Sequence, residues 1–141
     1  DAKIIMTHRD PARVVASEAS LFVTMRRAFH DHVEPNAVGR ELLDDLSAWA
    51  SRAAAARRSA DPSQFLDLSY EDLARNPIGA VDTIYRWLGM PFLPEVRERM
   101  TQHFNANRQH KHGPHPYALA DFGLREEEVR EQFPPSLPLA K

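Results

Sequence analysis

Arg9 and Ser17 are the two side chains of this 141-residue sequence whose types and spacing best suit the binding of an anion. An Arg side chain offers a fork of N–H donors that fits phosphate oxygens. If a helix begins at Pro11, Ser17 lies six residues further on, about 9 Å along the axis at about 1.5 Å per residue. A phosphate beside the first two turns would meet both side chains. The alternatives are an ion pair of Arg9 with Asp10 or Glu18, and a packing role for Ser17 as a small residue at a helix contact.

A short apolar strand and a capped helix are expected to position this pair. Residues 3–7, KIIMT, are apolar and include two Ile, which is typical of a strand buried on both faces in a parallel sheet. Asp10 is a favourable N-cap and Pro11 a favourable first helical residue. Open α/β sheets bind ligands at the C-terminal ends of their strands. The helix N-terminus there is expected to offer free backbone N–H groups and a partial positive charge.

The rest of the chain predicts one more strand among several helices. Residues 65–70, FLDLSY, alternate in the way typical of a strand, and a short helical turn follows. Helices are expected after Pro11, from about residue 40 to 58, from Pro77 to Gly89, from Pro94 onward and within residues 124–133, with a loop over residues 30–39. The apolar stripe predicted for the first of them comprises Val14, Val15, Leu21, Phe22, Met25 and Phe29.

Two strands that alternate with helices predict a parallel α/β sheet. Two parallel strands alone leave edges unpaired and faces uncovered. We therefore expect the upstream part of a larger domain to be missing from the chain, and the alternative is a helical body with a single strand pair. The sequence opens at Asp1 shortly before the first strand, which also favours a fragment or a processed product.

Composition excludes several classes of protein. The formal net charge is −2, so there is no electrostatic footprint for nucleic-acid binding. The absence of Cys excludes disulfides and thiolate metal sites, and it is compatible with a cytoplasmic location. No apolar run approaches the roughly 20 residues of a membrane helix, so no integral membrane segment is expected. His103, His110, His112 and His115 have spacing that can ligate Zn²⁺. No carboxylate with suitable spacing accompanies them, and we predict no metal site.

Two segments resemble sulfotransferases that use 3′-phosphoadenosine 5′-phosphosulfate (PAPS). HRDPARVVASEASL, residues 8–21, resembles the family's 3′-phosphate-binding segment, in which an Arg closes a strand and a Ser follows eight residues later. The resemblance assigns Arg9 and Ser17 to the 3′-phosphate. LSYEDLARNPIGAVDTIYRWLG, residues 68–89, resembles a segment whose Tyr lies near the adenine. Tyr70 is its counterpart, and the alternative for Tyr70 is a core aromatic with a satisfied hydroxyl.

A third segment resembles the tail of the bacterial branch of this family. In KHGPHPYALADFGLREEEVREQF, residues 111–133, a basic loop with a Gly precedes a Tyr, Phe-Gly-Leu and an acidic helix. The resemblance makes Lys111, His112 and Gly113, with Arg108 as a neighbour, further candidates for contact with the 3′-phosphate.

The resemblance implies that residues 1–141 are the C-terminal part of a single P-loop-like, three-layer sulfotransferase domain, mostly helical with about two parallel strands. The phosphosulfate-binding loop and the catalytic base of the family cannot be assigned in this sequence, so alone the chain would hold half of a nucleotide site. The implied activity is sulfuryl transfer from PAPS, which leaves PAP (3′-phosphoadenosine 5′-phosphate), to a hydroxyl or amine of an unidentified small-molecule, lipid or carbohydrate acceptor. The alternatives are half of another nucleotide-binding phosphotransferase, or a non-catalytic helical interaction module.

Overall fold

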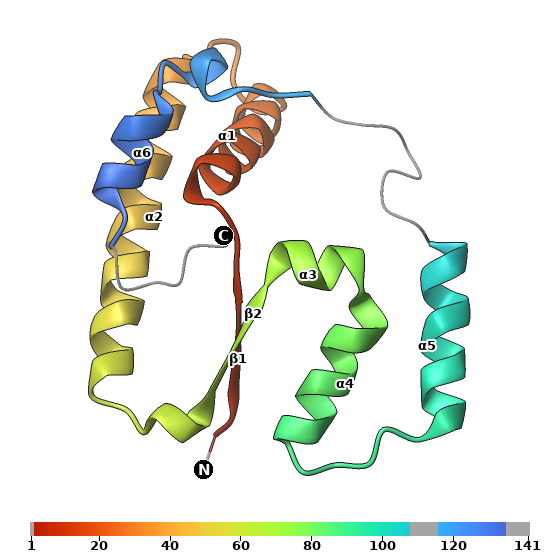
Figure 1. Cartoon of the computed structure of the whole chain (residues 1–141). Helices are drawn as coiled ribbons and strands as arrows, with labels where there is room; N and C mark the ends of the chain where they lie inside the picture. Colours follow the sequence, from red (N-terminus) through yellow and green to blue (C-terminus); the bar gives the residue numbers. More distant parts are fainter. Residues whose placement is uncertain (1, 108–115, 135–141) are drawn as a thin grey trace. The chain divides into compact units, whose positions relative to one another are not determined.

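The chain divides into two compact units, each built from two separated stretches of sequence (Figure 1). The structure, a computed structural model, describes residues 2–107 and 116–134. The first unit comprises Asp1–His8 with Ser63–His115, and the second comprises Arg9–Pro62 with Pro116–Lys141. Since each unit is discontinuous in sequence, its two stretches must meet before its core is complete.

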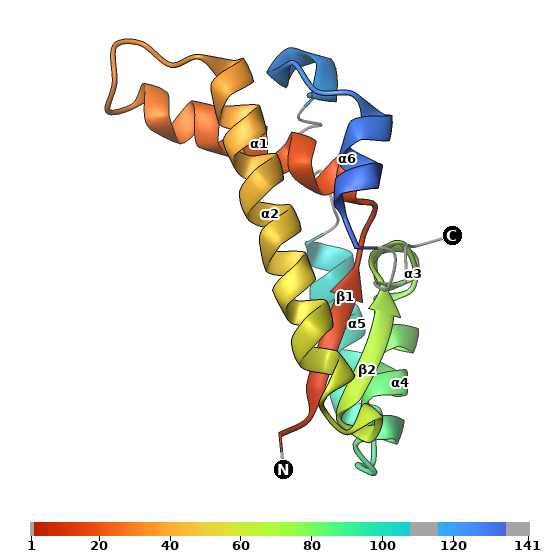
Figure 2. The ribbon, with the colours of Figure 1, turned by 90° about the vertical axis from the view of Figure 1, so that its left-hand side faces the viewer.

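A parallel strand pair forms the sheet of the first unit (Figure 2). β1 (Ile4–His8) pairs with β2 (Phe65–Ser69), with Ile4 opposite Phe65 and His8 opposite Ser69. The predicted parallel pair is therefore confirmed. The predicted burial of both faces is wrong for the part of the chain described, because Ile4 and Ile5 are 41% and 42% exposed. Within that part, β2 alone pairs with β1.

A side-chain hydrogen bond joins the C-terminal residue of β1 to the middle of β2. Nε2 of His8 lies 2.5 Å from Oδ1 of Asp67, and the imidazole is largely buried. His8 thus fills the end of the strand, directly before Arg9 in the chain.

Local capping sets the helices that follow β2. They are α3 (Tyr70–Arg75), α4 (Pro77–Trp87) and α5 (Pro94–Ala106), and the short 3₁₀ helix η1 (Pro62–Gln64) precedes the strand. The side chain of Asn76 accepts a hydrogen bond from the backbone N–H of Gly79 at 3.0 Å, with Pro77 as the first helical residue. The predicted cap is confirmed. Gly89 has a φ of +68°, which lets the chain turn away after α4.

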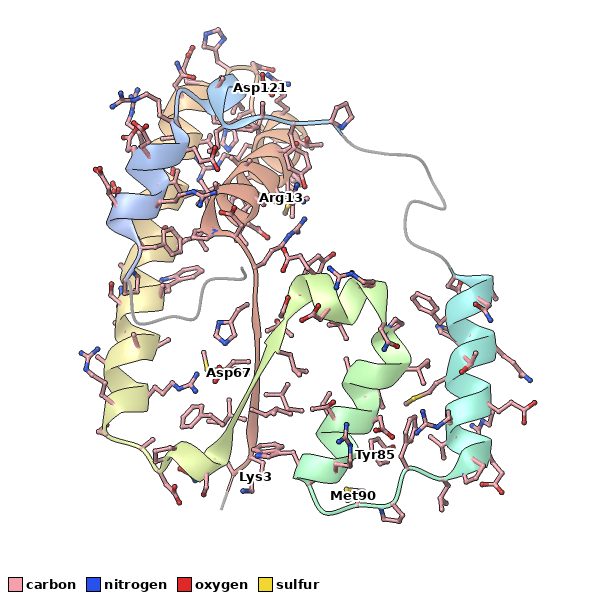
Figure 3. The ribbon with its side chains drawn as sticks, viewed as in Figure 1. Lys3, Arg13, Asp67, Tyr85, Met90 and Asp121 are labelled. Atoms are coloured by element: carbon pink, nitrogen blue, oxygen red, sulfur yellow. The ribbon has the colours of Figure 1, made fainter. Side chains whose placement is uncertain are left out.

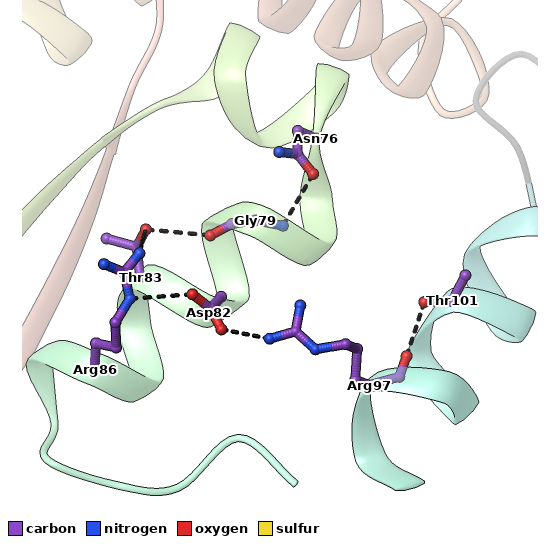
Figure 4. A network of polar contacts seen from close by, with 7 residues as sticks. All are labelled: Asn76, Gly79, Asp82, Thr83, Arg86, Arg97 and Thr101. Atoms are coloured by element: carbon purple, nitrogen blue, oxygen red, sulfur yellow. Dashed lines mark hydrogen bonds and ion pairs between the residues drawn. The ribbon is translucent and has the colours of Figure 1, made fainter. Parts of the chain in front are cut away.

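A polar network joins α4 to α5 (Figure 4). Asp82 accepts a hydrogen bond from Arg97 at 2.5 Å and forms an ion pair with Arg86 at 3.0 Å. The guanidinium of Arg97 also lies 4.4 Å from the ring centroid of Phe92, which in turn packs against Tyr85. Asp82 therefore balances charge within its own helix and connects that helix to the next.

Helices and one 3₁₀ turn make up the second unit. α1 (Pro11–Arg27) packs against α2 (Pro35–Arg58), and η2 (Leu119–Phe122) and α6 (Glu126–Gln132) pack against both (Figure 1). The helix predicted from about residue 40 begins at Pro35, so the predicted loop over residues 30–39 is too long. The reason is that Glu34 gives no side-chain cap, and only the Pro at the first position marks this start.

Small side chains form the buried face of α1. One apolar cluster comprises Ala12, Val15, Leu43, Leu124 and Val129, and a second comprises Ala19, Val23, Val38, Leu42 and Phe122. The predicted stripe of α1 is correct at Val15 and at Phe22, which packs against the second cluster, but wrong at three other positions. Leu21, Met25 and Phe29 are 51%, 53% and 85% exposed. The helix turns its Ala residues inward because these allow close approach of its neighbours, and the larger side chains lie outside.

Candidate functional site

The corner at the start of α1 is held by Asp10. Its Oδ1 atom accepts a hydrogen bond from the backbone N–H of Ala12 at 2.9 Å, and its carbonyl oxygen accepts from Arg13 and Val14, each at 3.0 Å. Pro11 has no N–H group. The predicted N-cap is confirmed, but the expected free backbone N–H groups are not present in the first turn. An anion at this corner therefore cannot use the N–H groups of Ala12, Arg13 and Val14, and side-chain donors become more important.

Arg130 of α6, 120 residues after Asp10 in the sequence, also contacts this corner. Its Nη2 atom donates to Oδ2 of Asp10 at 2.8 Å and also to Glu126. Both carboxylate oxygens of Asp10 are thus engaged, one in the cap of α1 and one in the contact with α6. This arrangement fixes the backbone next to Arg9 and balances two carboxylates with one guanidinium.

A hollow of about 480 Å³ opens at this corner, entirely within the second unit. It is lined by Arg9, Asp10, Ala12, Arg13, Ala16, Tyr117, Ala118, Leu119 and Glu126. Arg9 is partly buried, whereas Arg13, which Figure 3 labels on α1, is exposed. Arg13 makes no ion pair or side-chain hydrogen bond with any residue in the ranges 2–107 and 116–134. The wall of the hollow thus contains two guanidinium groups, those of Arg9 and Arg13, next to apolar side chains.

Ser17 lies one turn beyond Arg13 on α1. It is partly buried, and its hydroxyl has no hydrogen-bond partner among the residues that the structure describes. It is not one of the residues that line the hollow. Arg13 and Ser17 are four residues apart in α1 and so lie on successive turns of one ridge of that helix, whereas Arg9 precedes the N-cap Asp10 and lies outside the helix.

The other predicted site residues lie elsewhere. Tyr70 is the first residue of α3 and is partly buried in the first unit. Arg108, Lys111, His112 and Gly113 lie outside the described residues, as do three of the four His residues of the alternative metal cluster. Within the described ranges, no group of three His, Asp or Glu residues could hold a metal ion. No described helix is long and apolar enough to cross a membrane.

Sequence reasoning missed three residues of this corner: Arg13, Tyr117 and Arg130. The spacing of Arg13, four residues from both Arg9 and Ser17, is a signal that the sequence contains. The partnership of Arg130 with Asp10 spans 120 residues and has no local signal.

A second hollow, of about 590 Å³, lies in the first unit and differs in its charges. Among its lining residues, Asp72 pairs with Arg75 at 3.1 Å, Asp82 pairs with Arg86 and Asp67 bonds to His8. The described cations of this hollow already have acidic partners close by. The corner at Arg9 is therefore the better candidate for an anionic ligand.

Residues 1–95 match the model of the sulfotransferase family. The match covers more than half of the chain, and the chain belongs to the sulfotransferase family. The fold, mostly helical with two parallel strands, is an α/β portion of the sulfotransferase fold.

Particular relatives are mycobacterial. The chain is 32% identical over 111 residues to the omega-hydroxy-beta-dihydromenaquinone-9 sulfotransferase Stf3 of Mycobacterium bovis and to that of Mycobacterium tuberculosis. These matches cover 72% of this chain and 28% of each relative, so the chain spans under a third of the curated relatives' length.

Two crystal structures resemble the chain. Sulfotransferase STF1 from Mycobacterium tuberculosis aligns with a TM-score of 0.70 and 34% identity, over 94% of this chain and 33% of that one. Sulfotransferase STF9 from Mycobacterium avium aligns with a TM-score of 0.82 and 22% identity, over 93% of this chain and 34% of that one. The second likeness is one of fold alone.

Proposed function

We propose that the protein carrying this chain transfers a sulfuryl group from PAPS to a hydroxyl or amine acceptor, and that this chain supplies the 3′-phosphate and adenine side of the cofactor site. The observation that carries the proposal is the hollow at the start of α1. There Arg9 forms part of the wall and Ser17 follows two turns later, in a chain of the sulfotransferase family.

The donor set of this corner suits a phosphate group. Arg9 offers a fork of donors, Ser17 offers a hydroxyl without a described partner, and the first-turn N–H groups are already used. In this proposal, Arg9 and Ser17 hold the 3′-phosphate and the ring of Tyr70 stacks on the adenine. In this proposal, Arg108, Lys111, His112 and Gly113, which lie outside the described residues, add contacts to the 3′-phosphate. When bound, PAPS supplies the sulfuryl group that is transferred.

The contribution of these residues is to bind and to orient the nucleotide. Holding a donor in a fixed position lowers the entropic cost of reaction. Contacts with the 3′-phosphate also select the nucleotide against those that lack this group. None of these side chains is assigned to proton transfer.

We also propose that residues 1–141 form the C-terminal part of one sulfotransferase domain, whose phosphosulfate-binding loop and catalytic base lie in a further part. The chain covers only 28% of the length of the curated relative and 33% of that of STF1, which supports this proposal. The exposure of Ile4 and Ile5 supports it as well, because parallel sheets normally bury both faces. The name of one relative specifies an omega-hydroxy-beta-dihydromenaquinone-9, and this supports a hydroxyl acceptor over an amine for the present protein.

Calorimetric titration with PAP and with adenosine 5′-phosphate tests the proposal. We expect PAP to bind more tightly than adenosine 5′-phosphate, and Arg9→Ala to weaken PAP by roughly 30-fold, or about 2 kcal/mol for a lost charge-assisted bond. Arg27→Ala, at the other end of α1, is the matched control and should leave both affinities unchanged. Equal affinity for the two nucleotides would remove the role of the 3′-phosphate. Binding that requires Mg²⁺ would favour the phosphotransferase alternative.

A further inference from the structure

Backbone donors are already committed at the corner of α1. The N–H of Ala12 bonds to the side chain of Asp10, and the N–H groups of Arg13 and Val14 bond to its carbonyl oxygen. A phosphate in the hollow therefore receives no hydrogen bond from these three N–H groups, and side-chain donors matter more. Arg9 alone offers one positive charge, whereas a phosphomonoester carries between one and two negative charges at neutral pH.

The acidic residues of the hollow do not neutralise Arg13. Asp10 and Glu126 both bond to Arg130, and each Asp10 oxygen is engaged. Arg13 has no acidic partner within the described part of the chain. An Arg on the wall of a concave site, with the neighbouring carboxylates already occupied, is available to an anionic ligand.

The position of Arg13 on α1 places it between the two proposed phosphate contacts. It lies four residues after Arg9 and four before Ser17. Arg13, Ala12 and Ala16 all line the hollow, and the two Ala residues have short side chains.

We propose that Arg13 is a second guanidinium contact for the 3′-phosphate, an inference that rests on the proposed function and deepens it. Two forks of donors, one from Arg9 and one from Arg13, match a terminal phosphomonoester with three free oxygens. A nucleotide with a free 3′-hydroxyl gains nothing from either fork. Arg13 is thus a specificity residue for the sulfate donor and for its product PAP.

Arg13→Gln and Arg13→Lys in the full-length protein that carries this chain test the inference by calorimetry. We expect Arg13→Gln to weaken PAP about tenfold, the factor that about 1.4 kcal/mol represents, and to change adenosine 5′-phosphate less than about twofold. Arg13→Lys should restore part of the PAP affinity, since it keeps the charge and loses the fork. Arg27→Gln, an exposed Arg in the last turn of α1, is the control and should change neither affinity.

The outcomes separate this inference from the function on which it rests. If the unchanged protein does not prefer PAP to adenosine 5′-phosphate, both proposals fail. If PAP is preferred and Arg9→Ala weakens it, but Arg13→Gln leaves it within about twofold of the unchanged protein, the role of Arg13 alone is overturned. An equal loss of both nucleotides in Arg13→Gln also overturns it, because the contact is then not with the 3′-phosphate. Arg13 is exposed, and thermal unfolding of each variant checks that the fold is retained.

Discussion

Replacement of Gly39 by alanine tests how closely α2 must approach η2. Gly39 is buried in α2, and a Cβ atom built on it would lie 2.6 Å from the carbonyl oxygen of Phe122 and 2.8 Å from the Phe122 Cβ. The nearest obstacle is backbone, which cannot rotate away as the end of a flexible side chain does. To accept Gly39→Ala, η2 must therefore move away from α2.

Two opposing effects set the size of the change. In an open helix, replacing Gly by Ala stabilises by about 1 kcal/mol. Forcing extra volume into a packed interior costs about 1–3 kcal/mol, and the backbone contact places this case in the upper part of that range. We therefore expect Gly39→Ala to lower the free energy of unfolding by about 1–2 kcal/mol, opposite in sign to the effect of helix propensity alone.

Urea unfolding of Gly39→Ala, followed by circular dichroism, measures this free energy. Ser51→Ala, at an exposed position of the same helix, is the control and should stabilise by about 0.5 kcal/mol or less. Because Leu119 of η2 and the nearby Tyr117 line the hollow, Gly39→Ala should also weaken PAP binding. A Gly39→Ala variant as stable as the parent protein would refute the close approach of α2 and η2.

Two further variants probe the corner and the contact between α1 and α2. Arg130→Gln removes the bond to Asp10 and leaves the carboxylates of Asp10 and Glu126 without their positive partner beside the hollow. PAP should therefore bind several-fold more weakly, and the free energy of unfolding should fall by less than about 1 kcal/mol. An unchanged affinity for PAP in the titration would contradict this. The hydrogen bond from Arg26 lowers the pKa of Glu41, so this pair stabilises the fold above the ordinary pKa of about 4.3 and loses its effect as acid protonates Glu41. Glu41→Gln should therefore have a lower melting temperature than the parent protein at neutral pH and the same melting temperature in strong acid. A difference in melting temperature that persists in strong acid would argue against the pair.

Capping was predictable from sequence because it is local. Asp10 bonds to an N–H two residues away, and Asn76 to one three residues away, so residue type and a following Pro contain the signal. The start of α2 at Pro35 was missed because Glu34 provides no side-chain cap. Parallel pairing of the two strands followed from their alternation with helices, which is a regular property of this class.

Packing and long-range contacts limited the rest of the prediction. An apolar stripe assumes that large side chains face inward, whereas α1 buries Ala12, Ala16 and Ala19 and exposes Leu21. The same limit applies to the site. Arg9 and Ser17 were predicted from a local motif. The hydrogen bonds of first-turn N–H groups to the carbonyl oxygen of Asp10, and the bond of Arg130 to its side chain, were not predicted, because they depend on the folded geometry.

The order of protein synthesis gives the Asp10–Arg130 contact a further consequence. The ribosome releases residue 10 long before residue 130, and the whole of β2, α3, α4 and α5 is made in the interval. The corner at Asp10 therefore cannot be completed until α6 has been made. A product that terminates before residue 126 would lack the bond from Arg130 to Asp10 beside the hollow, even if its earlier helices had formed.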